Sequence, residues 1–140
     1  MNIRKIFTTE YNNNLQSIWL LLLRVLAGAF MLTHGFPKFQ MLFSGQEILF
    51  PDPIGLGSQL SFIMIVFAEF FCSIFIIVGF GTRFSAIPLS FSMFVAAFIV
   101  HGKDPFASKE LALIYLLIFI GFIFSGSGKF SVDYLIAGKK

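Results

Sequence analysis

Charged residues and cysteines are scarce in this chain of 140 residues. Asp, Glu, Lys and Arg make up 12% of the sequence, about half of their usual share in a soluble domain. The one cysteine, Cys72, lies inside an apolar run. A disulfide framework, a CxxC dithiol and a cysteine-based zinc site are therefore excluded within this sequence, and we expect no metal site.

Apolar residues are abundant instead. They make up 57% of the sequence, 21 of them are Phe, and the mean hydropathy is +0.88. They are gathered in long runs, which is typical of segments that cross a bilayer. A chain of this length accommodates roughly four spans of about 20 residues each. We therefore predict one all-α integral membrane domain over residues 1–140, a four-transmembrane-helix bundle in contact with lipid.

Helix-ending and helix-starting residues locate the spans approximately. Gly79-Phe80-Gly81 ends the second apolar run, His101-Gly102 ends the third, and Asp104-Pro105 begins the fourth. Ala27-Gly28-Ala29 resembles a signal-peptide cleavage site, but Arg24 inside the first run argues against one, so we keep this run as a span. The predicted spans are residues 16–35, 58–79, 83–101 and 105–125, with an interfacial loop over 36–57.

The basic residues predict an orientation in the membrane. The net charge is +3, but the Lys and Arg residues form no basic stripe, so we set nucleic acid aside as a partner. Four spans place six basic residues on the side of the termini and three on the other side, which favours cytoplasmic termini in the cell (inner) membrane. The six are Arg4, Lys5, Arg83, Lys129, Lys139 and Lys140, and the three are Lys38, Lys103 and Lys109.

Two ionisable residues lie well inside the predicted spans. Arg24 is in the first span and Glu69 in the second, and a buried charge normally faces a partner or a cavity. Because both fall near the predicted midplane of antiparallel neighbours, we predict that they pair. The pair either locks two helices together or forms the floor of a polar pocket, and both alternatives stay open here.

Small and polar residues recur at helical spacing on three spans and predict facing seams. The first seam is Arg24, Ala27, Gly28, Met31 and His34; the second is Ser61, Ala68, Glu69, Cys72 and Gly79; the third is Ala86, Ser90, Met93, Ala97 and His101.

The outward ends of these seams carry the densest chemistry. His34 and Lys38 could donate hydrogen bonds to a quinone oxygen, and His101 or Glu110 could exchange its proton, with Lys109 beside them. Such residues are also ordinary at a membrane interface. Two histidines could ligate a haem b, which is the less favoured interpretation.

A series of short motifs, in order along the chain, resembles the DoxX family. The series is Arg24, His34-Gly35 with Lys38, Phe50-Pro51-Asp52-Pro53, Gly55-Leu56-Gly57, Ala68-Glu69, Gly79 to Thr82-Arg83, Met93 with Ala96, Lys109-Glu110 with Tyr115, and Gly126 to Lys129 with Ser131 and Asp133. The resemblance implies a small four-helix membrane protein related to the membrane subunit of thiosulfate:quinone oxidoreductase. It also implies a link to sulfur or oxidative-stress metabolism.

Two functions from different classes follow from these observations. The first is a quinone-interacting subunit of a membrane oxidoreductase, with a polar cavity that opens outward between the four spans. In it Arg24, His34, Lys38, Glu69 and Lys109 would bind the quinone, and His34, Glu110 and His101 would be catalytic. A redox protein partner is implied because the sequence has no flavin, haem or iron–sulfur motif. The alternative is a non-enzymatic scaffold or lipid-binding protein, and a homo-oligomer is compatible with both.

Overall fold

A computed structural model describes residues 12–138. This part of the chain is helical and contains no β-strand. Two of its helices include a π-helical segment, in which backbone hydrogen bonds reach the fifth residue along the chain. The elements are α1 (Asn13–Leu42), α2 (Ser58–Val66), η2 (Phe67–Cys72), α3 (Ser73–Val78), α4 (Thr82–Val95), η3 (Ala96–Val100), α5 (Phe106–Ser125) and α6 (Val132–Ala137).

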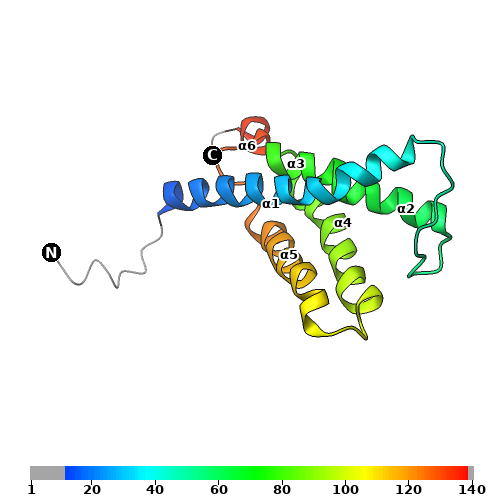
Figure 1. The fold of residues 1–140 in the computed structure, drawn as a ribbon. Coiled ribbons are helices and arrows are strands. Elements are labelled where there is room, and N and C mark those ends of the chain that lie inside the picture. The colour runs from blue at the N-terminus through cyan, green and yellow to red at the C-terminus, as the bar shows by residue number, and fades with distance from the viewer. Residues whose placement is uncertain (1–11, 139–140) are drawn as a thin grey trace.

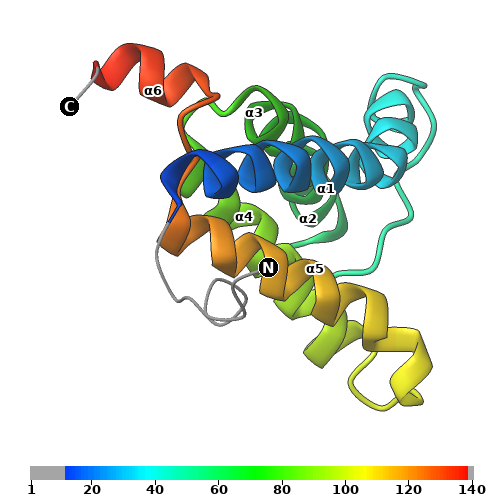
Figure 2. The same cartoon turned by 90° about the vertical axis from the view of Figure 1, so that its left-hand side faces the viewer.

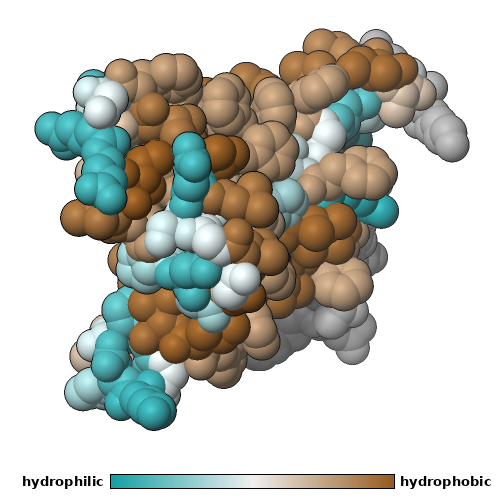
Figure 3. Space-filling view, turned by 90° about the vertical axis from the view of Figure 1, so that its right-hand side faces the viewer, coloured by the Kyte–Doolittle hydropathy of each residue, from teal (hydrophilic) through white to brown (hydrophobic). Residues whose placement is uncertain are grey.

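Four continuous helices are long and apolar enough to cross a membrane. They are α1, the run α2–η2–α3, the run α4–η3, and α5. Many of their large apolar side chains face outward, including Phe84 at 81% exposed and Leu117 at 72%. Figure 3 shows apolar residues over much of one face, with polar residues in separate patches. The predicted all-α fold with four membrane spans is confirmed.

The first helix is longer than the sequence predicts. It ends at Leu42, so residues 36–42 of the predicted interfacial loop are helical and that part of the prediction was wrong. Pro37 lies inside the helix, where a proline removes a backbone hydrogen bond at a cost of about 3 kcal/mol. Packing offsets this cost, because Phe39 stacks on Phe70 with ring centroids 4.2 Å apart. The helix bends toward its C-terminal end, as expected near a proline (Figure 1).

The four spans form two antiparallel pairs. One pair is α1 with α2–η2–α3 and the other is α4 with α5. The pairs meet near the turn between α3 and α4 and diverge away from it (Figures 1 and 2). A common core lies where they meet, and it includes Ala27 and Met31, Cys72, and Ala86 and Met93. The predicted facing seams are therefore confirmed for their inner members, whereas the outer ends of the pairs separate.

Small residues let the first pair pack closely. A Cβ on Gly28 would lie 2.5 Å from the Ile77 side chain and 3.0 Å from the Ser73 carbonyl oxygen. In lipid, where water does not drive apolar side chains together, such close backbone approach is a main source of helix association.

The short helix α6 is held against the turn between α3 and α4. The amide of Asp133 donates to the Gly79 carbonyl at 2.9 Å. Its carboxylate accepts from the amides of Gly81 at 2.6 Å and Thr82 at 3.0 Å. Three backbone groups of the turn are thus satisfied by one residue of α6, which fixes the helix to the end of the bundle.

Candidate ligand cavity between the helix pairs

A cavity of about 740 Å³ lies between α2–η2 and α4–η3, on the side where the helix pairs diverge. Its polar lining residues are Lys38, Ser61, Glu69 and Ser92. The other lining residues are aliphatic, aromatic or proline: Phe50, Pro51, Pro53, Ile54, Ile63, Met64, Ile65, Phe67, Ala68, Ile87, Pro88, Phe91, Val95, Ala96 and Val100. The size and the few polar groups are typical of a site for a small molecule.

An ion pair forms the polar end of this cavity. The Nζ atom of Lys38 lies 2.5 Å from Oε2 of Glu69, and the Glu69 side chain is 5% exposed, against 30% for Lys38. Both residues were predicted to bind a cofactor, but not to pair with each other. In an apolar setting this hydrogen-bonded pair keeps both charges satisfied, and either partner alone would be costly.

The sequence brings the pair together through Gly35. A Cβ on Gly35 would lie 2.5 Å from the carbonyl carbon of Glu69, so only glycine lets α1 approach η2 this closely. Lys38 follows less than one turn later, on the side of α1 that faces η2. Gly35 therefore lets the two helices approach because it has no side chain, and the long side chain of Lys38 then reaches Glu69.

Both π-helical segments border the cavity. Phe67, Ala68 and Glu69 come from η2, and Ala96 and Val100 come from η3. A π-helical turn is less stable than an α-helical one and is frequent at functional sites. In η2 the wider turn includes Glu69 and directs it toward α1.

A loop covers one side of the cavity. Phe50 lies against Phe62 with ring centroids 5.2 Å apart, and the neighbouring prolines also line the cavity. Asp52 holds the loop, since its carboxylate accepts from the amides of Leu56 at 2.9 Å and Gly57 at 2.7 Å and from the Ser61 hydroxyl at 2.8 Å. The hydrogen bonds from Gly57 and Ser61 lower the pKa of Asp52 below its usual range.

The predicted pair of Arg24 and Glu69 is wrong. Arg24 is fully buried, but its Nη2 atom donates to the Phe130 carbonyl oxygen at 2.5 Å and its Nη1 atom lies against Gly79. Gly35 is the residue of α1 that faces Glu69, and Arg24 precedes it by 11 residues, or about 16 Å of helix. The misplacement arose because α1 extends to Leu42, which moves its midpoint toward its C-terminus.

The other predicted site residues lie outside the cavity. His34 is exposed on α1. His101 contacts Asp104 at 2.7 Å in the connection from η3 to α5, and Lys109 donates to the Gly102 carbonyl at 3.0 Å. Glu110 is exposed in the first turns of α5. The structure brings His101 and Lys109 into one region, while Figure 1 places the end of α1 that carries His34 apart from it.

The predicted polar cavity between all four spans was therefore wrong in composition and in place. The cavity is mainly apolar and α5 contributes no described residue to its lining. Within residues 12–138, no group of three His, Cys, Asp or Glu side chains could hold a metal ion.

Several residues that line the cavity or hold its loop were not predicted from the sequence. Ser61 was assigned to a seam and Asp52 to a motif, but neither was assigned to the site. A usable signal was present: an aspartate followed by Gly55, Gly57 and Ser58 is a pattern in which the carboxylate accepts amides before a helix starts. Ser92 and Pro88 gave no such signal, because they are separated from Glu69 in sequence and join it only by packing.

These four spans define a polytopic α-helical membrane protein with an ion-paired cavity between its helix pairs. Residues 19–102 match the DoxX family, so the chain belongs to the DoxX family. It is also similar to a protein of Haemophilus influenzae that is described as uncharacterized. The two are 34% identical over 134 aligned residues, which cover 86% of this chain and 95% of the relative. No solved structure matches the chain.

Proposed function

We propose that this DoxX-family protein binds a membrane quinone in the cavity between the helix pairs, as a quinone-interacting subunit of a membrane oxidoreductase. The observation that carries the proposal is the Lys38–Glu69 pair at the end of an apolar cavity of about 740 Å³. A quinone combines an apolar body with carbonyl oxygens that accept hydrogen bonds, and this lining offers both kinds of contact.

The polar residues of the cavity have different roles in this proposal. Lys38 has three donors and spends one on Glu69, so others are available for a carbonyl oxygen at the same place. Glu69 provides a carboxyl group that exchanges a proton with that oxygen. Ser61 and Ser92 add hydroxyl groups on the opposite walls. These roles replace those first assigned to His34, His101, Lys109 and Glu110.

A redox protein partner belongs to the same proposal. A bound quinone would supply the two-electron chemistry, and the chain's own residues would bind it, orient it and move its protons. Electrons would pass between the quinone and that partner, and family resemblance links the substrate to sulfur or oxidative-stress metabolism.

We propose that the protein lies in the inner membrane with both termini in the cytoplasm. It rests on the basic residues, of which Arg4, Lys5, Lys139 and Lys140 lie outside the described residues. A cysteine introduced at Glu47, in a chain whose Cys72 is replaced by Ala, should react with an impermeant maleimide in intact cells. Reaction only after permeabilisation would reverse the orientation.

Binding of ubiquinone-1 to the purified full chain tests the quinone proposal. We expect Glu69→Gln and Lys38→Met to weaken binding about tenfold or more, the range for losing a hydrogen bond to a charged group. The matched controls are Glu110→Gln and Lys109→Met, which change the same residue types outside the cavity and should leave binding unchanged.

A second test changes the volume of the cavity and keeps the Lys38–Glu69 ion pair intact. Ala96 lines the cavity, so Ala96→Leu should fill part of it and weaken binding, whereas Ala29→Leu on the exposed face of α1 should not. If all six variants bind ubiquinone-1 like the wild type, or if phospholipid and no quinone occupies the purified protein, the quinone proposal fails. The second result would favour the scaffold or lipid-binding alternative.

A further inference from the structure

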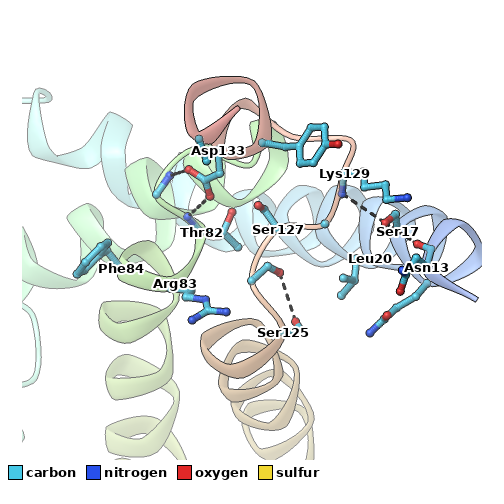
Figure 4. Close-up of a pocket in the computed structure, with 16 residues that line it drawn as sticks. Asn13, Ser17, Leu20, Thr82, Arg83, Phe84, Ser125, Ser127, Lys129 and Asp133 are labelled. Carbon is cyan, nitrogen blue, oxygen red and sulfur yellow. Dashed lines mark hydrogen bonds between the residues drawn. The ribbon is translucent and has the colours of Figure 1, made fainter. Parts of the chain in front are cut away.

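A second cavity, of about 580 Å³, lies at the end of the bundle where α1 begins, α4 begins and α5 ends. Its walls come from these three helices, from the connection between α5 and α6, and from α6 itself, as Figure 4 shows. Its lining is rich in Ser, Thr, Asn, Gln and Gly and includes two cations, Arg83 and Lys129. None of these residues belongs to the proposed quinone site.

The two cations lack an acidic partner in the described chain. Arg83 donates from Nη2 to the Phe124 carbonyl at 3.3 Å, and Lys129 donates from Nζ to Oδ1 of Asn14 at 2.8 Å. Neither forms a salt bridge within residues 12–138. Each therefore keeps donors available beyond its one neutral contact.

The one carboxylate in the cavity wall does not neutralise them. Each oxygen of Asp133 accepts a backbone amide, from Gly81 and from Thr82. Burial raises the pKa of Asp133, but the hydrogen bonds from these amides and from the side chains of Thr82 and Ser127 outweigh it and lower the pKa below its usual range. The carboxylate thus serves the turn between α3 and α4, and the cavity keeps an excess of positive charge.

The buried hydroxyl groups of the wall serve Asp133. Thr82 is 0% exposed, and hydrogen bonds from the side chains of Thr82 and Ser127 contribute to the lowered pKa of Asp133. Figure 4 shows Thr82 close to Asp133 and Ser127. The charged donors that remain for a ligand are therefore those of Arg83 and Lys129.

Two glycines in the connection from α5 to α6 bring its backbone close to the cavity wall. Gly126 has φ +72°, and a Cβ there would lie 3.2 Å from Nε of Arg83. Gly128 has φ +74° and packs against Ser17 and Leu20. The connection from α5 to α6 therefore follows the cavity wall closely, with hydroxyl groups at Ser125 and Ser127.

We propose that this cavity binds a phosphate group, held by Arg83 and Lys129. Arg and Lys are the usual ligands of phosphate, and basic pockets at the ends of membrane helices bind the head groups of anionic lipids. The neighbours in sequence of the lining residues Lys129 and Tyr134 include the exposed apolar residues Phe130, Leu135 and Ile136, as expected at the level of lipid head groups. A free phosphate compound offers the same chemistry, so the experiment distinguishes the two sources.

The test measures thermal unfolding of the full chain in a neutral detergent with three additions: dioleoylphosphatidylglycerol, dioleoylphosphatidylcholine, and inorganic phosphate against chloride at equal ionic strength. We expect phosphatidylglycerol to raise Tm more than phosphatidylcholine, whose quaternary ammonium the two cations repel. A response to phosphatidylglycerol alone identifies a lipid, and a response to inorganic phosphate identifies a soluble phosphate compound. Either result supports the proposal, and no response to either overturns it.

Variants assign the response to the site. Arg83→Gln with Lys129→Gln should weaken phosphate binding about tenfold or more. The matched control, Lys103→Gln with Lys109→Gln, removes the same charge from the other end of α4 and α5. An equal loss in both double variants would overturn the proposal, because the effect would then come from net charge alone.

Discussion

The backbone of Gly35 in α1 lies directly against the carbonyl group of Glu69 in η2. This contact sets the distance between the two helices at the point where Lys38 reaches the Glu69 carboxylate. A missing side chain thus positions a buried ion pair, and the cavity acquires its polar end as a consequence.

Gly35→Ala should destabilise the protein. The added methyl group meets backbone atoms of Glu69 and Phe70, which cannot rotate away as a side chain would. We expect a loss of about 1–3 kcal/mol, the usual cost of overpacking, and weaker ubiquinone-1 binding because Lys38 moves away from Glu69. Thermal unfolding by circular dichroism measures the first effect.

Gly121→Ala is the control for this substitution. Gly121 is also inside a helix, α5, but nothing lies within 4 Å of a Cβ added there. The replacement should leave stability unchanged or raise it by up to about 1 kcal/mol, because alanine favours a helix more than glycine. If both alanine variants behaved alike, close packing at Gly35 would not explain the effect.

Gly79→Ala and Gly81→Ala test the packing of Arg24. Both glycines have positive φ, +72° and +54°, so each replacement carries a backbone strain of about 1–2 kcal/mol. Only at Gly79 does the new methyl group also overlap the Arg24 guanidinium; at Gly81 the nearest atom is 4.0 Å away. We therefore expect Gly79→Ala to lower Tm more than Gly81→Ala. Equal losses would show that strain alone decides the result.

Asp133 should make stability depend on pH. Burial raises the pKa of Asp133, but hydrogen bonds from Thr82 and Gly81 outweigh it and lower this pKa in the folded protein. The stabilisation of the fold by the charged carboxylate is therefore fully present above the pKa of Asp in the unfolded chain, about 3.9. That stabilisation is lost as the pH falls through the lower pKa of Asp133 in the folded protein. Asp133→Asn should cost about 1 kcal/mol near neutral pH, as for the loss of a helix cap, and the difference from wild type should shrink as pH falls.

Glu47→Gln serves as the control for this pH series. Glu47 is an exposed carboxylate in the loop between α1 and α2. Tm measured from pH 6 to pH 3 should show the same difference between this variant and wild type throughout. A constant difference for Asp133→Asn as well would contradict the assigned pKa direction.

The sequence predicts the class of fold but only part of the site, and particular residues show why. Long apolar runs fix the four spans because few structures satisfy the backbone in lipid. The burial of Arg24 and Glu69 follows from the same physics, since both lie within those runs and both are buried. Their partners do not follow, because a helix that continues through Pro37 changes which residues of α1 face η2.

The remaining part of the site depends on features without a local sequence signal. A π-helical turn at Phe67–Cys72 shifts the faces of the second span, and nothing in the apolar pattern there distinguishes it from an α-helix. The divergence of the two helix pairs is a result of packing across the whole chain. It leaves His34 exposed, although helical spacing placed it on the same seam as the buried Met31.

Asp52 should control access to the cavity without supporting the spans. Its carboxylate accepts two loop amides and the Ser61 hydroxyl, and the loop it holds places Phe50, Pro51 and Pro53 over the cavity. Asp52→Ala should therefore speed chymotrypsin cleavage in the loop, where Leu49 is 86% exposed, and increase the dissociation rate of ubiquinone-1. The Tm of the spans should change little, since their packing is untouched.

Glu47→Ala removes another carboxylate from the same loop and should alter neither rate. The pKa of Asp52 is lowered by its hydrogen bonds from Gly57 and Ser61, so wild type should behave like Asp52→Ala only once pH falls through that lowered value. Faster cleavage without faster dissociation would show that the loop is held by Asp52 but does not retain the ligand. Ligand exchange would then pass between α2 and α4, directly from the bilayer.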